Sequence, residues 1–314
     1  MGSIYDKISI RLFHVRNRIQ EYQKRERTRH YGSENSDKTF YVIGYDYDTQ
    51  GLFAIVKSVL SHVMYAVDKG WIPVVDLKNY KSQYRNEGQN AWELFFEQPC
   101  GYSLEDISVS KNIIKSYYGM YPYNKYDFYV DILDYPDKIK PIADAYKKYI
   151  RPSSDVLKSM LEECEILGID DKTLGVLCRG TDYTSRKPHN HPCQPEPQNV
   201  IEDAKSFLKH NNYSKVFVAT EDQSVLDMFK SAFGDRLRYV SQSRLKLSEN
   251  QQFLSEVKID LSAKLKMAQD YYTALYLLSR CPSILAGRTA GTLGAVLMSE
   301  GFINSKFYNL GYYK

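Results

Sequence analysis

The sequence Thr173-Leu174-Gly175-Val176-Leu177-Cys178-Arg179-Gly180-Thr181-Asp182-Tyr183 joins an apolar run to an arginine, a glycine and a small polar cluster. The apolar run predicts a buried strand, and the carboxyl ends of strands in α/β sheets open onto the ligand crevice. An arginine there presents a planar fork of donors that suits two phosphate oxygens. Gly180 lets the backbone approach a ligand without an intervening Cβ. The pattern therefore indicates anion binding, and the structural alternative is a strand end whose arginine pairs with a carboxylate.

Strands and helices alternate from this point to the C-terminus. The pattern predicts strands at residues 173–178, 215–220, 237–240, 283–287 and 306–309. Helices are predicted at residues 199–210, 223–233, 262–279 and 289–299. Such alternation is typical of a parallel sheet with helices on both faces.

The first half contains a second unit of the same class. Strands at 40–44 and 71–76 flank a helix at 52–67, which makes a βαβ unit. A short helical turn is expected at 92–97 and helices at 141–150 and 154–167, whereas 101–140 has no clear pattern. We therefore expect an α/β protein of two Rossmann-like domains, 38–150 and 172–314, facing a cleft. A cleft between domains is a common small-molecule site.

Residues 4–29 precede both units and form the predicted segment 1–30, a basic amphipathic helix. Apolar residues recur every three or four positions and basic residues fill the remaining face. Such a helix can lie on an anionic membrane surface or dock on the body of the protein. Residues 32–37 read as a linker.

Composition narrows the class of function. The formal net charge of +4 favours anionic partners such as nucleotides, without the dense basic stripe of a nucleic-acid-binding protein. The five cysteines contain no CxxC pair, so free thiols in a reducing compartment are expected, and zinc is not. Without an apolar run long enough to span a bilayer, the expected location is the cytoplasm, at the inner membrane face if the N-terminal helix binds lipid. GxGxxG and GxxxxGK[ST] motifs are missing, which argues against dinucleotide-binding dehydrogenases and P-loop kinases.

Three strand ends of the second unit meet at one edge if its sheet is parallel. They supply Arg179 and Asp182 with Gly180, then Thr220-Glu221-Asp222, then Arg288-Thr289-Ala290-Gly291-Thr292. The last stretch opens a helix, whose free N–H groups and dipole attract phosphate. We expect a diphosphate clamp there, in which Arg288 adds charge; an ordinary turn with Thr289 as N-cap is the alternative.

These stretches resemble the fucosyltransferase superfamily, which includes α-1,6-, α-1,2- and protein O-fucosyltransferases. The similar segments are 177–183, 216–226, 275–281 and 286–293, within roughly residues 173–300. The resemblance implies a GT-B fold and inverting, metal-independent transfer from a nucleotide-diphosphate sugar, typically GDP-fucose, with no other cofactor. It also implies that Arg179 holds the β-phosphate and that Thr289 to Thr292 touch the phosphates.

The chain departs from the family pattern at several positions. The family histidine two residues before the arginine is Leu177, and the second arginine is Gly180. The position that faces guanine in relatives falls at Ala274, with Asp270 one turn earlier.

An inverting transfer needs a base for the acceptor hydroxyl and a cation for the leaving diphosphate. Arg179 is the expected cation and Asp182 the expected catalytic carboxylate; other candidate bases are Asp46, Asp48, His189 and His191. The leading hypothesis is a transferase for polysaccharide biosynthesis that acts on a glycan or lipid-linked glycan. The alternatives are a non-catalytic glycan- or nucleotide-binding protein, or a sugar-nucleotide epimerase or phosphoryl-transfer enzyme.

Overall fold

The computed structural model describes residues 15–16, 26–44, 50–116, 125–184, 186–244 and 259–314, without the side chains of Thr181 and Asp182. The N-terminal half, residues 26–150, contains a four-stranded sheet with the order β1-β4-β2-β3. β2 runs parallel to β3 and β4, and β1 runs antiparallel to β4. The elements up to the second sheet are β1 (Thr28–Arg29), β2 (Phe40–Gly44), α2 (Leu52–Asp68), β3 (Ile72–Asp76), β4 (Ile113–Lys115), η1 (Val130–Asp134), α3 (Pro136–Tyr149) and α4 (Ser154–Leu167).

The C-terminal half, residues 172–314, contains a five-stranded sheet with the order β7-β6-β5-β8-β9. All of its strand pairs are parallel. Its elements are β5 (Thr173–Leu177), α5 (Thr181–Thr184), α6 (Pro197–Asn211), β6 (Lys215–Ala219), α7 (Gln223–Phe233), η2 (Gly234–Arg236), β7 (Leu237–Arg238), α8 (Leu261–Arg280), β8 (Ser283–Gly287), α9 (Ala290–Met298) and β9 (Asn304–Tyr308). The prediction of an α/β protein with two parallel, Rossmann-like sheets is confirmed.

Helices cover both faces of the C-terminal sheet because alternate strand residues are buried on opposite sides. Val176 and Val218 pack in one apolar cluster with α6 and α7, whereas Leu177 and Ala219 pack in another with α8 and α9. β5 carries no polar side chain between Thr173 and its end, so it can occupy the centre of this layer.

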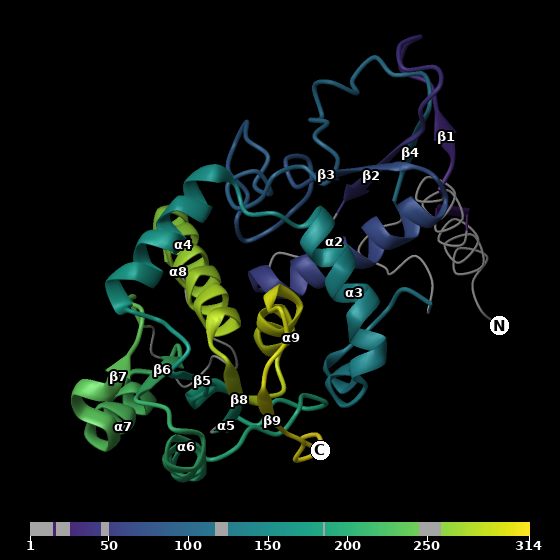
Figure 1. Cartoon of the computed structure of the whole chain (residues 1–314). Coiled ribbons are helices and arrows are strands. Elements are labelled where there is room, and N and C mark those ends of the chain that lie inside the picture. The colour runs from purple at the N-terminus through teal and green to yellow at the C-terminus, as the bar shows by residue number, and fades with distance from the viewer. Residues whose placement is uncertain (1–14, 17–25, 45–49, 117–124, 185, 245–258) are drawn as a thin grey trace, which may run out of the picture.

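The two halves share one apolar core. The cluster that contains α8 and α9 also contains α2, α3 and α4. The ring of Phe53 on α2 packs edge-on against Tyr272 on α8, with centroids 5.5 Å apart, and Phe96 lies 4.9 Å from the same ring. In Figure 1 these helices lie between the two sheets. The predicted domain boundaries stay a proposal, since no polar gap separates the halves here.

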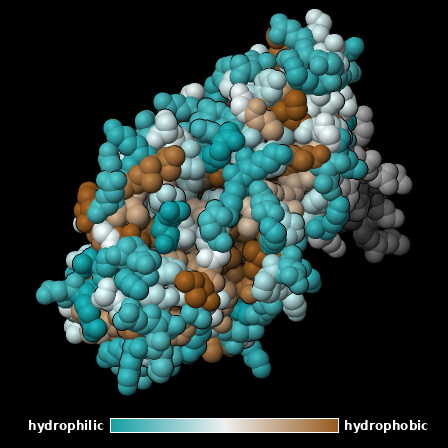
Figure 2. Space-filling model, viewed as in Figure 1, coloured by the Kyte–Doolittle hydropathy of each residue, from teal (hydrophilic) through white to brown (hydrophobic). Residues whose placement is uncertain are grey.

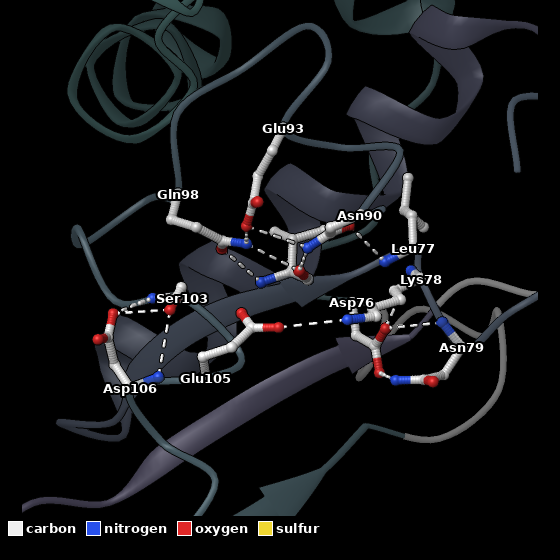
Figure 3. Close-up of polar contacts among 11 residues, drawn as sticks. Asp76, Leu77, Lys78, Asn79, Asn90, Glu93, Gln98, Ser103, Glu105 and Asp106 are labelled. Carbon is white, nitrogen blue, oxygen red and sulfur yellow. Dashed lines mark hydrogen bonds and ion pairs between the residues drawn. The ribbon is translucent and has the colours of Figure 1, made fainter. Parts of the chain in front are cut away.

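Side-chain amides cover the β3 edge of the N-terminal sheet. At β3 the Gln98 Oε1 accepts from the Val75 amide at 2.8 Å, and the Asn90 Oδ1 accepts from the Leu77 amide at 3.0 Å. The side-chain NH₂ groups of Gln98 and Asn90 each donate to the Val75 carbonyl and to Glu93 Oε1, as Figure 3 shows. An unpaired strand edge is a template for aggregation, and these side chains occupy the hydrogen-bonding groups that a further strand would use.

The structure corrects the sequence prediction in the first half. Most of the helix predicted at 4–29 lies outside the described residues, but Thr28 and Arg29 form a strand paired with β4. Just before that strand, the Glu26 carboxylate accepts from the hydroxyls of Tyr41 and Tyr65 at 2.7 and 2.8 Å. This end of the segment therefore docks on the body of the protein.

Three other segments of the first half differ from the sequence prediction. The helical turn predicted at 92–97 is a series of turns, and the unassigned stretch 101–140 contains β4 and η1. β4 escaped prediction because it is only three residues long and pairs at both edges with distant segments. The predicted linker at 32–37 is tied down by a bridge between Glu34 and Ser110.

The visible surface carries mainly hydrophilic residues with scattered apolar ones (Figure 2). Single exposed apolar side chains are normal on folded proteins. No helix within the described ranges has the length and apolarity to cross a bilayer. All five cysteines are free, as expected.

Candidate functional site

The C-terminal sheet reverses its strand order between β5 and β8. From β5 the chain moves outward to β6 and β7 on one side, and then crosses to β8 and β9 on the other. In open α/β sheets, ligands bind outside the carboxyl ends of the strands at such a reversal. The segments after β5, β6 and β8 leave the same edge, as predicted, because these three strands are parallel neighbours.

Arg179 follows β5 at the reversal. Its guanidinium Nη1 pairs with Glu221 Oε2, and its guanidinium carbon Cζ lies 5.0 Å from the centroid of the Tyr183 ring. The Arg179 side chain is 19% exposed and that of Glu221 is 25% exposed. A carboxylate and an aromatic face thus hold a partly accessible cation at the edge of the sheet.

The turn after β6 is built around a capped helix. The Asp222 carboxylate accepts from the amides of Ser224 and Val225 at 2.8 and 3.3 Å and caps α7. Thr220 is buried, and its hydroxyl accepts from the Asp222 amide at 3.2 Å. A Cβ on Gly180 would lie 2.4 Å from Asp222. Gly180 is therefore required for packing against this cap, a reason that the sequence alone did not indicate.

The turn between β8 and α9 presents a helix start at the same edge. Thr289 is the N-cap, and its hydroxyl accepts from the Thr292 amide at 3.1 Å. The Thr292 hydroxyl donates to the Gly287 carbonyl. The amides of Ala290 and Gly291 belong to the first turn, where N–H groups have no partner within the helix. This start can bind an anion through its amides and dipole.

Arg288 lies beside this turn but points elsewhere. Its side chain is only 3% exposed, and its guanidinium pairs with Asp131 and Asp134 of η1. Arg179 and Arg288 were expected to clamp one diphosphate together. In the structure they have different carboxylate partners, because Arg288 extends toward the N-terminal half.

The N-terminal half reaches the sheet edge through Tyr84. Burial raises the pKa of the Tyr84 hydroxyl, its hydrogen bond with the Leu52 backbone opposes the shift, and the nearby Glu221 charge adds to it. Gln83 donates to the Gln50 carbonyl at 2.6 Å and so ties this loop to the start of α2. The Tyr84 loop of the N-terminal half therefore experiences the charge of Glu221 in the C-terminal half.

The structure describes only some of the candidate bases. Asp46 and Asp48 lie outside the described residues, as does the side chain of Asp182. His189 is exposed. The Nδ1 of His191 is 3.3 Å from the Tyr183 hydroxyl, and the two rings meet edge-on with centroids 5.5 Å apart. Of the described candidates, His191 thus lies beside the aromatic face that supports Arg179.

Near the position expected to face guanine, Ala274 is buried, and Asp270 is buried with its carboxylate paired to Lys266.

We also searched for side chains that could bind a metal ion. No group of three or more His, Cys, Asp and Glu in the described parts of the chain could hold a metal ion.

The chain was compared with protein families, curated proteins and solved structures, and the solved structures include similar folds. No protein-family model matches the chain, and no curated protein matches its sequence. Solved structures do match. POFUT1 in complex with GDP has a TM-score of 0.51 and 12% identity, over 87% of this chain and 99% of that one.

Two further solved structures match the fold of the chain with similar TM-scores. POFUT1 in complex with GDP-fucose has a TM-score of 0.51 and 12% identity, covering 86% of this chain and 98% of that one. NodZ α-1,6-fucosyltransferase co-crystallized with GDP has a TM-score of 0.50 and 18% identity, covering 83% of this chain and 93% of that one. The chain therefore resembles fucosyltransferases in fold, and the expected GT-B-like architecture is confirmed.

Proposed function

We propose that this protein is a glycosyltransferase that uses a GDP-sugar, in the first instance GDP-fucose. The observation that carries the proposal is the position of Arg179. It lies at the strand-order reversal of a sheet whose fold resembles structures of POFUT1 and NodZ determined with GDP. Ligands of such sheets bind at this reversal.

In the proposed site, Arg179 contacts the β-phosphate. A guanidinium binds two phosphate oxygens at once and stabilises the charge that develops as the diphosphate leaves. The start of α9, from Thr289 to Thr292, faces the same edge and contributes amides and the positive end of the helix dipole. Gly180, Thr220, Glu221 and Asp222 complete the walls of the donor site, with Thr220 and Asp222 acting through the turn that they build.

The reaction follows from these charges. A fixed guanidinium and a helix start supply the positive charge that a metal ion supplies in other transferases, so the proposed transfer is independent of metal. Inversion requires a base that removes the acceptor proton as the hydroxyl attacks. Asp182, three residues after Arg179 and within α5, is the proposed base, and His191 is the alternative.

The acceptor half is the N-terminal one in this proposal. A glycan or a lipid-linked glycan would approach alongside the Tyr84 loop and the start of α2, which are hydrogen-bonded to each other. The basic segment 4–29 would suit a lipid-linked acceptor at an anionic membrane surface on the cytoplasmic side.

One observation favours a second candidate function. Arg179 already has a carboxylate partner in Glu221, and Asp222 caps a helix, so this edge is also stable without catalysis. A protein that only binds a nucleotide or a glycan would need no base.

Two measurements test the proposal. Calorimetry with GDP, UDP, CDP and TDP should show preferential GDP binding, and GDP-fucose without acceptor should be hydrolysed slowly to GDP. GDP binding without any hydrolysis or transfer would favour the binding protein. No binding of any of the four nucleotides would reject both the transferase and a nucleotide-binding protein, and would leave only a glycan-binding protein.

A further inference from the structure

Arg288 connects the β8–α9 turn to the N-terminal half. The residue directly precedes Thr289, the N-cap of α9. Its Nη1 lies 3.3 Å from Asp131 Oδ1, and its Nη2 pairs with Asp134 Oδ1. Both aspartates belong to η1, which leads into α3, and α3 in turn packs against α9.

The C-terminal segment binds the other oxygens of the same carboxylates. The Tyr312 hydroxyl donates to Asp131 Oδ2 at 2.7 Å, and the Asn309 amide donates to Asp134 Oδ2 at 3.5 Å. Three segments are thereby joined through two carboxylates: the β8–α9 turn, η1 and the tail after β9. We call this set of Arg288, Asp131, Asp134, Asn309 and Tyr312 the Arg288 cluster.

Because Arg288 is buried, the Arg288 cluster fixes the orientation of the β8–α9 turn. With a side chain only 3% exposed, Arg288 needs its carboxylates, because a buried charge without a partner is strongly destabilising. The two aspartates are about half exposed and come from the other half of the chain. The guanidinium therefore holds the turn that carries Thr289 in one orientation relative to η1.

We propose that Arg288 is a positioning residue of the phosphate site and not a phosphate ligand. Through Asp131 and Asp134 it fixes the β8–α9 turn, so that the first amides of α9 face the diphosphate. This inference rests on the proposed function, and it leaves Arg179 as the cation that contacts phosphate.

If Arg288 is instead a phosphate ligand, replacing its two aspartate partners should have the opposite effect on GDP affinity. If Arg288 swings out to bind phosphate, Asp131 and Asp134 compete with the ligand for its guanidinium. Replacing both aspartates with asparagine would then leave GDP affinity unchanged or improve it. If Arg288 positions the turn, the same replacement weakens GDP binding although neither aspartate touches the nucleotide.

The test is GDP calorimetry on the wild type, R288M, D131N/D134N and the triple variant R288M/D131N/D134N. We expect each of the first two variants to bind GDP roughly 3- to 30-fold more weakly, the range typical of residues that act without touching the ligand. The triple variant should bind no more weakly than R288M, because all three changes break one connection. If D131N/D134N does not fold, D131N and D134N are tested singly, because each leaves Arg288 paired with the remaining carboxylate.

Asp203 provides a matched control. It also accepts from a cation and a tyrosine, Lys306 at 2.6 Å and Tyr308, but it joins α6 to β9 within the C-terminal half. D203N should lower the melting temperature without changing GDP affinity. Equal weakening by D203N, or normal GDP affinity in D131N/D134N, overturns the positioning role. A wild type that binds no GDP overturns the proposed function instead, so the two failures are distinct.

Discussion

Gly294 on α9 lies directly against the ring of Phe53 on α2, and a Cβ at Gly294 would stand 2.2 Å from Phe53 Cδ1. This is a contact between the two halves of the chain. Phe53 also packs against Tyr272, so the close approach of α9 and α2 belongs to the shared apolar core. A glycine is needed here for space, since its neighbour is a buried ring and not a flexible surface side chain.

We therefore expect Gly294→Ala to destabilise the protein by about 1–3 kcal/mol, the usual cost of overpacking a core. The melting temperature measures the loss. Gly51→Ser is the control, because Gly51 is the N-cap of α2 with no atom within 4 Å of an added Cβ. Serine is preferred at N-caps, so this variant should keep or gain stability. Equal melting temperatures for Gly294→Ala and the wild type would contradict the packing argument.

Arg179→Ala should weaken GDP binding. A lost charge-assisted hydrogen bond costs roughly 1.5–3 kcal/mol, which corresponds to about 10- to 150-fold in the dissociation constant. Arg179→Lys should not restore the affinity, since an ammonium is a point charge without the planar fork. Calorimetry measures both.

Lys215→Met is the control for Arg179. Lys215 has the same 19% side-chain exposure and also pairs with a carboxylate, Asp170, but it begins β6 at the opposite edge of the sheet. This variant should bind GDP normally. If Arg179→Ala also binds GDP normally, Arg179 does not belong to the site.

Donor turnover should survive a strong chelator. The proposed positive charges at the leaving diphosphate are the Arg179 guanidinium and the start of α9, neither of which chelation removes. GDP release from GDP-fucose in EDTA, compared with added magnesium or manganese, measures this. Activity that disappears in EDTA and returns with either metal would contradict the proposed role of Arg179.

Glu26 should anchor the segment that follows the basic N-terminus. Glu26→Ala removes two hydrogen bonds to a carboxylate, from Tyr41 and Tyr65, and should lower the melting temperature. Deletion of residues 1–25 retains Glu26 and β1, so it should preserve the fold and GDP binding. Deletion of residues 1–30 should destabilise, because it also removes the strand paired with β4.

The same deletion tests membrane binding. Basic residues near an anionic surface contribute about 1 kcal/mol each, and salt weakens the attraction. We expect the full chain, but not the chain without residues 1–25, to bind phosphatidylserine vesicles in a salt-sensitive manner. Full-length protein that ignores such vesicles at low salt would reject the membrane role of this segment.

Stability should fall in acid through two ion-paired aspartates, Asp134 at the end of η1 and Asp170 shortly before β5. A hydrogen bond from Arg288 lowers the pKa of Asp134, and one from Lys215 lowers the pKa of Asp170. A lowered folded-state pKa means that the unfolded chain binds protons first. The contribution to stability is therefore present above the ordinary value of about 3.9 and is lost as the pH falls through the folded-state pKa.

Melting temperatures between pH 7 and pH 2.5 measure this effect. Asp134→Asn and Asp170→Asn should each melt lower at neutral pH and show a shallower decline in acid than the wild type. Identical slopes for wild type and variants would show that these pairs contribute nothing to the acid dependence.

The sheet edge at which we propose the site could be predicted because its signals are short and sequential. A buried apolar run followed by Arg179-Gly180 indicates a strand end, and Thr289 to Thr292 indicate a helix start. The roles of Gly180 and Arg288 were not predictable. The partner of Gly180 is Asp222 on the next strand–helix turn, and Arg288 pairs with Asp131, 157 residues earlier.

The α/β class, the helices and strands of the C-terminal half and the edge at which Arg179 lies could all be predicted from the sequence, because periodicity and strand ends are local properties of the chain. Which charged side chains pair with each other depends on long-range packing. The pairing of Arg179 with Glu221, and of Arg288 with Asp131 and Asp134, depends on how strands and halves pack. The same packing stabilises β4, a strand too short to form without its two neighbours.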